Sequence, residues 1–269
     1  MPERPSWIPH GVDITQANVS RIYDYFLGGS HNFAVDREAA RAAIRSMPGI
    51  PAIARANRAA MQRALRFAME RGITQFLDVG SGIPTFGSVH EVVRARRPGS
   101  RVVYIDNDPV AVAHSRAVLA DDPDAAVAAA DLRDPAGLLG RPEVRALDFE
   151  RPVALLLVAV VHFLSDADGP AGIIAALRDA LAPGSVLVIT HATLDHGPAP
   201  DGQRAVQDVY DRTPTPLVMR TVAQMRPLFS GFDVVEPGIV PLPHWRPNAP
   251  DEPFDRVELH GLVGVGVKP

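Results

Sequence analysis

The chain has 269 residues, and its 27 Lys and Arg against 31 Asp and Glu give a formal net charge of −4. Hydrophobic residues make up 46% of the chain and charged residues 22%, which is typical of a globular protein with a sizeable core. The absence of cysteine excludes disulfides, thiolate nucleophiles and metal sites built on sulfur. The mildly negative charge gives no general drive toward nucleic acid or anionic membranes.

The sequence indicates neither a signal peptide nor a membrane-spanning segment. The first ten residues lack the apolar stretch of a signal peptide. The longest apolar run, Val153–Val161, is far shorter than the roughly 20 residues that a membrane-spanning helix needs. We therefore expect a cytoplasmic protein with no membrane partner and no nucleic-acid partner.

Residues 1–72 are predicted to be helical. Apolar side chains recur there at helical spacing, and the breaks between the runs carry glycine or proline. No strand pattern precedes residue 73, so we interpret this part as an N-terminal helical cap or lid. The pattern predicts three helices, near residues 15–27, 36–47 and 51–71.

Residues 73–269 have a different character and are predicted to form one further structural unit. Short apolar runs alternate with helical stretches there, which is typical of right-handed βαβ units and a mostly parallel sheet. The tail adds two strands, near residues 232–235 and 257–267, which we expect to form an antiparallel hairpin at the sheet edge. The earlier strands are expected at residues 74–79, 101–105, 126–130, 153–158 and 186–190, with helices near 86–96, 109–119 and 171–181.

The residues that follow these strands carry the main functional signal. Ligands of open parallel sheets bind at the carboxyl ends of the strands, so side chains at those positions share one crevice. A carboxylate at Asp106, 26 residues past Gly80, is suited to accept both hydroxyls of a ribose. This feature predicts an adenosine-containing ligand without choosing between NAD and S-adenosylmethionine. The candidate residues are Asp78, Gly80 and Gly82 after the first strand, Asp106 and Asn107 after the second, Asp131 after the third, Ala159 to His162 after the fourth, and His191 after the fifth.

Three features favour S-adenosylmethionine over a dinucleotide. Pro84 stands where a third glycine of the dinucleotide motif would fall, and it removes a backbone N–H that a pyrophosphate needs. The Asp78 carboxylate would repel a pyrophosphate but suits the cationic amino-acid part of S-adenosylmethionine. Asp131 can accept a hydrogen bond from the exocyclic amine of adenine.

Several sequence blocks resemble the motif series of class I S-adenosylmethionine-dependent methyltransferases. These blocks are FLDVGSGIPT, VVYIDNDPVAVAHSRAVL, AAADLRDP, LLLVAVVHFL and LAPGSVLVITH. The blocks SRIYDYFLGGSHNFAVDREAA and ANRAAMQRALRFA resemble one bacterial subfamily, the "S-adenosyl methyltransferase" family that was formerly a domain of unknown function. The resemblance implies a Rossmann-like α/β fold with a seven-stranded sheet, its last strand antiparallel, and an N-terminal helical cap.

The resemblance also implies roles for individual residues. Departure from the usual glycine triplet at Pro84 affects the backbone path around the methionine part of the cofactor. By resemblance, Gly80, Ser81 and Gly82 flank the methionine part, Asp106 and Asn107 the ribose, and Asp131 and Leu132 the adenine, while the backbone carbonyl of Ala159 binds the amino group.

The aromatic N-terminal block allows two interpretations. Tyr23 and its neighbours could form the apolar face of a helix packed on the sheet. Alternatively, the segment Tyr23–Asn32 folds over the crevice as a lid, with Tyr23 and Asn32 reaching the cofactor and excluding water from it.

Two histidines are candidate general bases. His162 and His191 both follow strands at the crevice, although each could equally be a structural histidine. A base assists when the acceptor is a hydroxyl or thiol, whereas the sulfonium of S-adenosylmethionine already activates the methyl group. We find no convincing metal site. Acceptor specificity is expected near Tyr210, Arg212, Met219, Trp245 and Arg246.

The sequence therefore predicts an S-adenosylmethionine-dependent methyltransferase that acts on a small-molecule acceptor and releases S-adenosyl-L-homocysteine. We expect a monomer or a homodimer. Two alternatives remain open at this point: a non-catalytic S-adenosylmethionine-binding regulatory protein, and an NAD-dependent oxidoreductase that uses the same glycine turn and Asp106.

Overall fold

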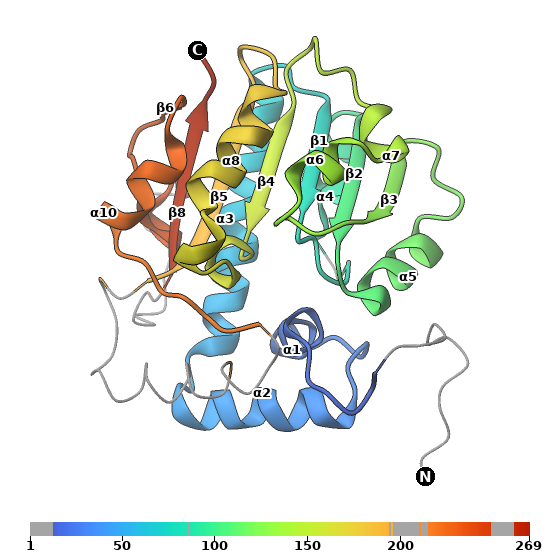
Figure 1. Cartoon of the computed structure of the whole chain (residues 1–269), viewed down its shortest axis with the longest axis vertical. Coiled ribbons are helices and arrows are strands. Elements are labelled where there is room, and N and C mark those ends of the chain that lie inside the picture. The colour runs from blue at the N-terminus through green and yellow to red at the C-terminus, as the bar shows by residue number, and fades with distance from the viewer. Residues whose placement is uncertain (1–12, 85–86, 194, 196–209, 211–214, 249–260) are drawn as a thin grey trace.

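A computed structural model describes residues 13–84, 87–193, 195, 210, 215–248 and 261–269 (Figure 1). Its centre is an eight-stranded sheet in the order β3-β2-β1-β4-β5-β8-β6, with β7 pairing on β8. The first five strands are parallel to one another, and β8 runs antiparallel to β5, β6 and β7. The strands are β1 (Gln75–Val79), β2 (Arg101–Asp106), β3 (Ala125–Ala129), β4 (Ala154–Val158), β5 (Val186–Ala192), β6 (Asp233–Val234), β7 (Val240–Pro241) and β8 (Gly261–Val267).

Helices connect these strands and precede them, as the sequence pattern predicts. Several helices have a proline at their first position, directly after the N-cap residue. In α5, for example, the N-cap Asp108 accepts the N–H of Val110 at 3.1 Å, and Pro109 is the first helical residue. The α-helices are α1 (Val19–Phe26), α2 (Ala34–Ser46), α3 (Ile50–Glu70), α4 (Val89–Arg94), α5 (Pro109–Val118), α6 (Pro135–Leu139), α7 (Pro142–Arg145), α8 (Pro170–Asp179) and α10 (Val222–Met225). The 3₁₀-helices are η1 (Val161–Phe163), η2 (Asp166–Asp168), η3 (Arg226–Phe229) and η4 (Leu242–His244).

The sheet is covered by helices on both faces, which explains its continuous apolar strands. Residues of α3, α4 and α5 pack on one face together with Trp245. Residues of α6, α7, α8 and η3 pack on the other. Because both faces are buried, β4 is apolar throughout, and every residue of β1 is buried, including Gln75 and Asp78.

The closing strands differ from the sequence prediction in one way. The sheet has eight strands instead of seven, because the two-residue strand β7 adds to β8. The antiparallel pair of β6 and β8 lies at the sheet edge as predicted, with β6 as the outer strand and β8 between β5 and β6. The antiparallel orientation of β8 is as predicted, and the part of the predicted strand before residue 261 lies outside the described residues.

The helices α1 and α2 lie beyond the carboxyl ends of the parallel strands, and α3 runs from them along the sheet (Figure 1). A separate apolar cluster joins α1, α2 and the start of α3 to Phe163, Tyr210 and Leu217. The C-terminal half of α3 packs on the sheet itself, so this one helix contacts both the cap and the sheet.

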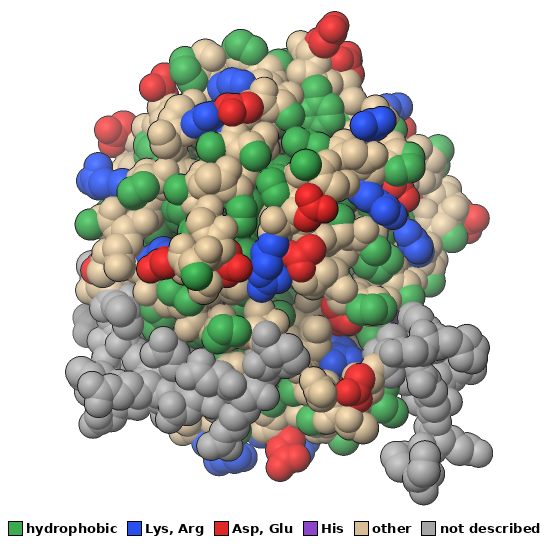
Figure 2. Space-filling view, viewed as in Figure 1, with side chains coloured by type: hydrophobic (Ala, Val, Ile, Leu, Met, Phe, Trp, Pro, Cys, Tyr) green, Lys and Arg blue, Asp and Glu red, His purple; other side chains and the backbone are tan. Residues whose placement is uncertain are grey.

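The surface carries charges of both signs. On the face shown in Figure 2, Lys and Arg side chains are interspersed with Asp and Glu side chains. Among the described residues, no helix is both long enough and apolar enough to cross a membrane.

Candidate active site

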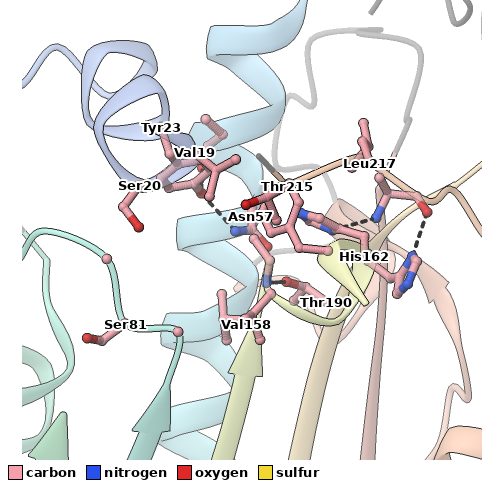
Figure 3. Close-up of a pocket in the computed structure, with 18 of the residues that line it drawn as sticks. Val19, Ser20, Tyr23, Asn57, Ser81, Val158, His162, Thr190, Thr215 and Leu217 are labelled. Carbon is pink, nitrogen blue, oxygen red and sulfur yellow. Dashed lines mark hydrogen bonds between the residues drawn. The ribbon is translucent and has the colours of Figure 1, made fainter. Parts of the chain in front are cut away.

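A cavity of about 230 Å³ lies between the carboxyl ends of β1 to β5 and the helical cap. Its wall includes the turns after these strands, α1, the N-terminal half of α3, and residues from 215 to 219. Figure 3 shows Ser81 on one side of this cavity, His162 and Leu217 on the opposite side, and Ser20 with Tyr23 from the cap. The sheet order explains this arrangement, because β1 and β4 separate the ends of β2 and β3 from the end of β5.

The turn after β1 needs its two glycines. Gly80 has a φ of +72°, and a Cβ atom there would meet Cγ2 of Val160 at 2.3 Å. Gly82 has a φ of +64° and has open space where its side chain would be, at the wall of the cavity. L-residues avoid this backbone region, so glycine allows both the tight turn and close approach of a ligand. The backbone N–H groups of Gly80 and Ser81 donate to the carbonyl of Ile105 at 2.8 and 3.0 Å, which ties the turn to β2.

Asp106 at the end of β2 is held by the backbone. Its Oδ2 accepts the N–H of Gly82 at 2.7 Å, and its Oδ1 accepts the N–H of Asp108 at 2.8 Å. A carboxylate has about four acceptor positions, so both oxygens can accept further bonds from a ligand. Burial raises the pKa of Asp106 to about 6, against the lowering effect of these two N–H groups.

Asp78, on the neighbouring strand β1, is a second buried carboxylate of the cavity. It is 5% exposed and lies on the wall below the glycine turn. Burial raises the pKa of Asp78 to about 7, the charge of Arg58 on α3 lowers it, and the charge of Asp106 raises it. At neutral pH this site therefore holds a partly protonated carboxyl group, which a cationic ligand would ionise.

A cluster of polar side chains lies on the cavity wall after β2 and β3. Asn107 donates from Nδ2 to Oδ2 of Asp131 at 3.2 Å, and Arg133 forms an ion pair with Asp131 at 3.1 Å. Burial acts to raise the pKa of Asp131, but hydrogen bonds from Arg133 and Asn107 outweigh it and lower the pKa. Leu132 lies next to this group as an apolar part of the wall.

The turn after β4 is strained. Ala159 has a φ of +55°, which is unfavourable for a residue with a Cβ atom, and its N–H donates to Oγ1 of Thr190 at 2.8 Å. Such backbone persists where the surrounding structure over-determines it, and it is frequent at functional sites. Here it places Ala159 on the cavity wall, and the next residue, Val160, packs against Gly80 of the glycine turn.

The two candidate histidines share one peptide group, that of Ala192. The Ala192 N–H donates to Nδ1 of His162 at 3.2 Å, and the Ala192 carbonyl accepts from Nδ1 of His191 at 2.7 Å. Nε2 of His191 accepts from the guanidinium of Arg220 at 3.1 Å. These bonds assign the tautomers: His162 carries its proton on Nε2, and His191 carries its proton on Nδ1.

Both rings are neutral at pH 7. Burial lowers the pKa of His191 to about 4, with a smaller contribution from Arg220. Burial, His191 and Arg220 lower the pKa of His162 well below its usual value. Because the lone pair of each ring is already engaged by a donor, neither histidine presents a basic nitrogen to the cavity.

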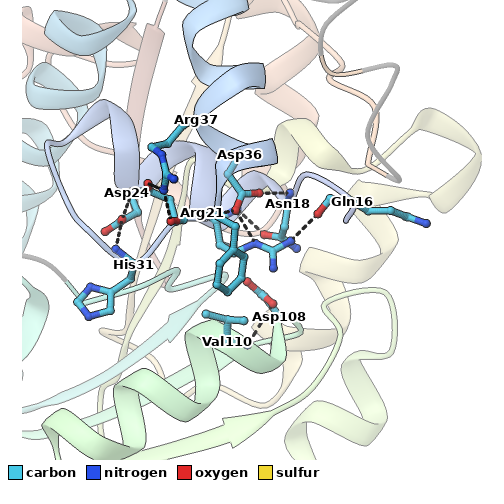
Figure 4. A network of polar contacts seen from close by, with 12 residues as sticks. Gln16, Asn18, Arg21, Asp24, His31, Asp36, Arg37, Asp108 and Val110 are labelled. Atoms are coloured by element: carbon cyan, nitrogen blue, oxygen red, sulfur yellow. Dashed lines mark hydrogen bonds and ion pairs between the residues drawn. The ribbon is translucent and has the colours of Figure 1, made fainter. Parts of the chain in front are cut away.

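Polar contacts hold the two helices of the cap together near the start of α5 (Figure 4). Arg21 of α1 is 3% exposed, and its Nε lies 3.2 Å from Oδ2 of Asp36. The Asp36 oxygens accept the N–H groups of Asn18 and Phe33 at 2.9 and 2.8 Å. Burial raises the pKa of Asp108 at the start of α5, and the charge of Arg21 opposes that rise, which links cap and sheet electrostatically.

A family model described as S-adenosyl methyltransferase matches residues 5–269, nearly the whole chain. The chain belongs to this family. It is therefore an S-adenosylmethionine-dependent methyltransferase, as the sequence motifs predict.

Solved structures agree with this assignment. A crystal structure of a "putative methyltransferase" from Thermobifida fusca YX is 41% identical, covers 98% of this chain and 99% of its own, and has a TM-score of 0.90. A DUF574 family protein from Streptomyces avermitilis MA-4680 is 40% identical over 96% of this chain and 99% of its own, with a TM-score of 0.89. A methyltransferase of Haloferax volcanii, solved with its Trm112 activator, is 18% identical over 84% of this chain and 94% of its own, with a TM-score of 0.54, and shows the fold alone. No curated protein matches the chain.

The residues present fit the cofactor of this family. Open space beside Gly82 leaves room for a ligand against the backbone, and Asp106 keeps acceptor positions for ribose hydroxyls. Asp78 supplies a buried carboxylate for an ammonium group, and the pair Asn107 and Asp131 supplies polar groups for a base edge.

The cap contributes one of the two predicted contact residues. Tyr23 lines the cavity, and its hydroxyl accepts from Nδ2 of Asn57 at 2.8 Å and donates to the carbonyl of Ala54 at 3.2 Å. Asn32 is not part of the described cavity wall, so its contact with the cofactor stays a prediction. Its Nδ2 donates to Asp24 at 2.8 Å and to the carbonyl of Gly29 at 3.0 Å, so it stabilises the loop after α1.

The predicted acceptor residues divide in the same way. Tyr210 and Met219 line the cavity. Trp245 does not, since it is fully buried against Phe67, with ring centroids 5.9 Å apart. Arg246 stacks on the outside of that pair, 4.6 Å from the Phe67 ring, and Arg212 lies outside the described residues.

Sequence reasoning missed three residues that shape the site. Asn57 and Arg58 lie on α3, where the small-residue pattern indicated only packing. Arg220 is 4% exposed and donates to the carbonyls of Val161 and Leu164 as well as to His191. A lone arginine in an irregular segment gives no periodic signal, so only the three-dimensional structure reveals it.

Proposed function

We propose that the protein transfers the methyl group of S-adenosylmethionine to a small-molecule acceptor by in-line displacement. The observation that carries this proposal is a single cavity with two unlike halves: a carboxylate-rich half at β1 to β3 and an apolar half under the cap. The cofactor supplies a methyl group that its sulfonium already activates. The main task of the chain is then to hold the acceptor in line and to exclude water.

Within this proposal each residue of the carboxylate-rich half has one task. To the cofactor-binding residues predicted from the sequence we add Arg58. Its guanidinium lies close enough to influence the Asp78 carboxyl, and it can bind the carboxylate of the methionine part. The proposed contacts are Gly80, Ser81 and Gly82 to the methionine chain, Asp78 and the Ala159 carbonyl to its amino group, Asp106 and Asn107 to the ribose, and Asp131 and Leu132 to the adenine.

Two features support a small molecule over a macromolecule as acceptor. The cap covers the site, since α1 and the first turns of α3 form part of the cavity wall. In addition, the visible surface mixes positive and negative side chains (Figure 2), whereas nucleic-acid binding favours a contiguous basic face.

The first experiment is a thermal shift with S-adenosyl-L-homocysteine, with NADH alongside. A ligand at 100 times its Kd stabilises the folded state by about 2.7 kcal/mol. We expect a shift with S-adenosyl-L-homocysteine and none with NADH. A shift with NADH alone would support the oxidoreductase alternative and overturn the proposal.

The second experiment tests the acceptor class. S-adenosylmethionine turnover is followed with the ultrafiltrate of a cell extract and, separately, with the protein and nucleic acid that the filter retains. We expect S-adenosyl-L-homocysteine to form with the ultrafiltrate. Turnover with the retained fraction alone would point to a macromolecular acceptor, and cofactor binding without turnover in either fraction would support the regulatory alternative.

A further inference from the structure

The half of the cavity next to the cap is distinct from the cofactor half in its chemistry. Its wall joins α1, the start of α3, η1 and residues 215–219, all parts of the separate apolar cluster. The apolar side chains that line this half, called here the acceptor pocket, are Phe26, Met47, Ile50, Phe163, Leu217 and Met219.

The charged side chains of the described cavity wall lie elsewhere. Asp106, Asp131 and Arg133 lie at the ends of β2 and β3. Asp78 lies in β1, and the charge of Arg58 acts on it. Within the described residues, the acceptor pocket therefore has no ionised group on its wall that could balance a charge on a ligand.

Several polar side chains also line this half, among them Tyr23, Asn57 and Thr215, and His162 lies in edge contact with Phe163 of the apolar cluster. His162 is 9% exposed, lines the cavity and lies across it from Ser81 (Figure 3). Because Nδ1 accepts from the Ala192 N–H, the proton lies on Nε2, and the ring acts as a hydrogen-bond donor. The same peptide group engages His191, and Arg220 engages the other nitrogen of that ring. The cationic Arg220 is itself 4% exposed and is neutralised by Asp166 at 2.6 Å.

We propose that the acceptor pocket binds an uncharged, mainly apolar molecule with a hydrogen-bond acceptor that receives the Nε2–H of His162. This proposal rests on the proposed function and names its substrate class. His162 is then a binding and specificity residue, and it does not remove a proton. An anionic or cationic acceptor would lose its hydration in this pocket without gaining a counter-charge.

The test uses three probes that share one ring system and differ in the group attached to it. The probes are 2-acetylnaphthalene, which is neutral and accepts a hydrogen bond, 2-isopropenylnaphthalene, which is its apolar isostere, and 2-naphthoate, which is its anionic isostere. Binding is measured by calorimetry on the full chain saturated with S-adenosyl-L-homocysteine. We expect the ketone to bind tightest and the carboxylate at least about tenfold more weakly, because an unpaired charge is costly to bury.

Variants of His162 identify the contact. In His162→Phe, which keeps a ring but donates no hydrogen bond, the ketone should lose its advantage over the apolar isostere. In His162→Gln, whose amide can donate, part of that advantage should return. A role in folding alone would change the affinity for ketone and isostere equally, and that result would overturn the assignment of His162.

The outcomes separate this proposal from the proposed function. Failure to bind S-adenosyl-L-homocysteine would overturn the proposed function. With that ligand bound, equal or tighter binding of 2-naphthoate would overturn the uncharged pocket, and so would the absence of binding by all three probes. Preference for the ketone in the wild type, lost in His162→Phe, supports it.

Discussion

The two halves of the cavity differ in how they are built and in how they treat charge. The cofactor half holds buried carboxyl groups, Asp78 and Asp106, on consecutive strands of a rigid sheet. The acceptor pocket holds neutral groups on irregular segments, and its charge, on Arg220, is turned away from the cavity toward carbonyls and Asp166. If the proposed function holds, the sheet recognises the charge of the ligand, whereas the cap side selects for shape and apolar surface.

The largest expected effect concerns the residue that organises the acceptor pocket. Arg220→Met leaves the carbonyl of Leu164 and Nε2 of His191 without their donor, and it removes one of the two donors to the carbonyl of Val161, which also accepts the N–H of Leu164. Each unsatisfied buried acceptor costs about 1–3 kcal/mol, so we expect the free energy of unfolding to fall by at least about 3 kcal/mol. Urea denaturation at pH 7 measures this change.

A matched control is Arg145→Met on α7, an exposed arginine, which should change stability by about 0.5 kcal/mol or less. In any folded fraction of Arg220→Met, the pKa of His191 should rise above its value of about 4, because the positive charge has gone. Equal stabilities of the two variants would show that Arg220 does not hold this half together.

The second prediction concerns the glycine turn of the cofactor half. Gly82→Ala places a methyl group at the cavity wall and forces alanine to a φ of +64°. We expect the affinity for S-adenosyl-L-homocysteine to fall by about 100-fold, equivalent to about 2.7 kcal/mol, as measured by calorimetry. The control is Gly72→Ala at the end of α3, with a φ of +84° and open space, away from the cavity. Both variants share the backbone strain, so equal loss of affinity would contradict a ligand contact at Gly82.

The third prediction is the pH dependence of the cofactor half. The pKa of Asp78 is raised to about 7 from 3.8. A raised carboxyl pKa favours the folded state at low pH, and this contribution is lost as the pH rises through about 4 to 7. Cofactor binding has the opposite sign, because an ammonium group on the ligand favours the ionised carboxylate.

We therefore expect the affinity for S-adenosyl-L-homocysteine to fall by up to about tenfold per pH unit below pH 7, while the contribution of Asp78 itself to the stability of the free protein does not fall. Calorimetry between pH 8 and about 5.5 follows the affinity. Asp78→Asn should bind weakly and remove the component of this dependence that arises near pH 7. A wild-type affinity that does not change with pH would show that Asp78 does not face the ammonium group.

The cofactor half was largely predictable because its residues follow consecutive strands with a strong apolar pattern. The acceptor pocket was not, since it brings together residues as distant in sequence as Phe26 and Leu217. Strand β7 has two residues and no periodic pattern, and the insertion of β8 beside β5 depends on long-range pairing. Asn32 was predicted to reach the cofactor as part of a lid, and in the structure its side chain bonds to Asp24 and Gly29 within the loop after α1, a local contact that the sequence pattern does not reveal.

The smallest predicted effect decides to which half the cap residue Tyr23 belongs. Tyr23→Phe removes the hydroxyl that accepts from Asn57 and donates to Ala54. We expect a loss of about 1 kcal/mol in the free energy of unfolding, because two partly buried hydrogen bonds are lost. The ring remains on the cavity wall, so the affinity for S-adenosyl-L-homocysteine should change by less than about threefold.

The matched control for this variant is Tyr25→Phe on the same helix. The Tyr25 hydroxyl accepts only an exposed bond from Arg41, at 3.3 Å, so its removal should cost little. If Tyr23→Phe instead weakens binding of S-adenosyl-L-homocysteine about tenfold and Tyr25→Phe does not, the Tyr23 hydroxyl contacts the cofactor, and the cap closes on both halves of the cavity. If neither affinity changes, the cap acts on the cofactor through the position of α3 alone, and its specificity lies in the acceptor pocket.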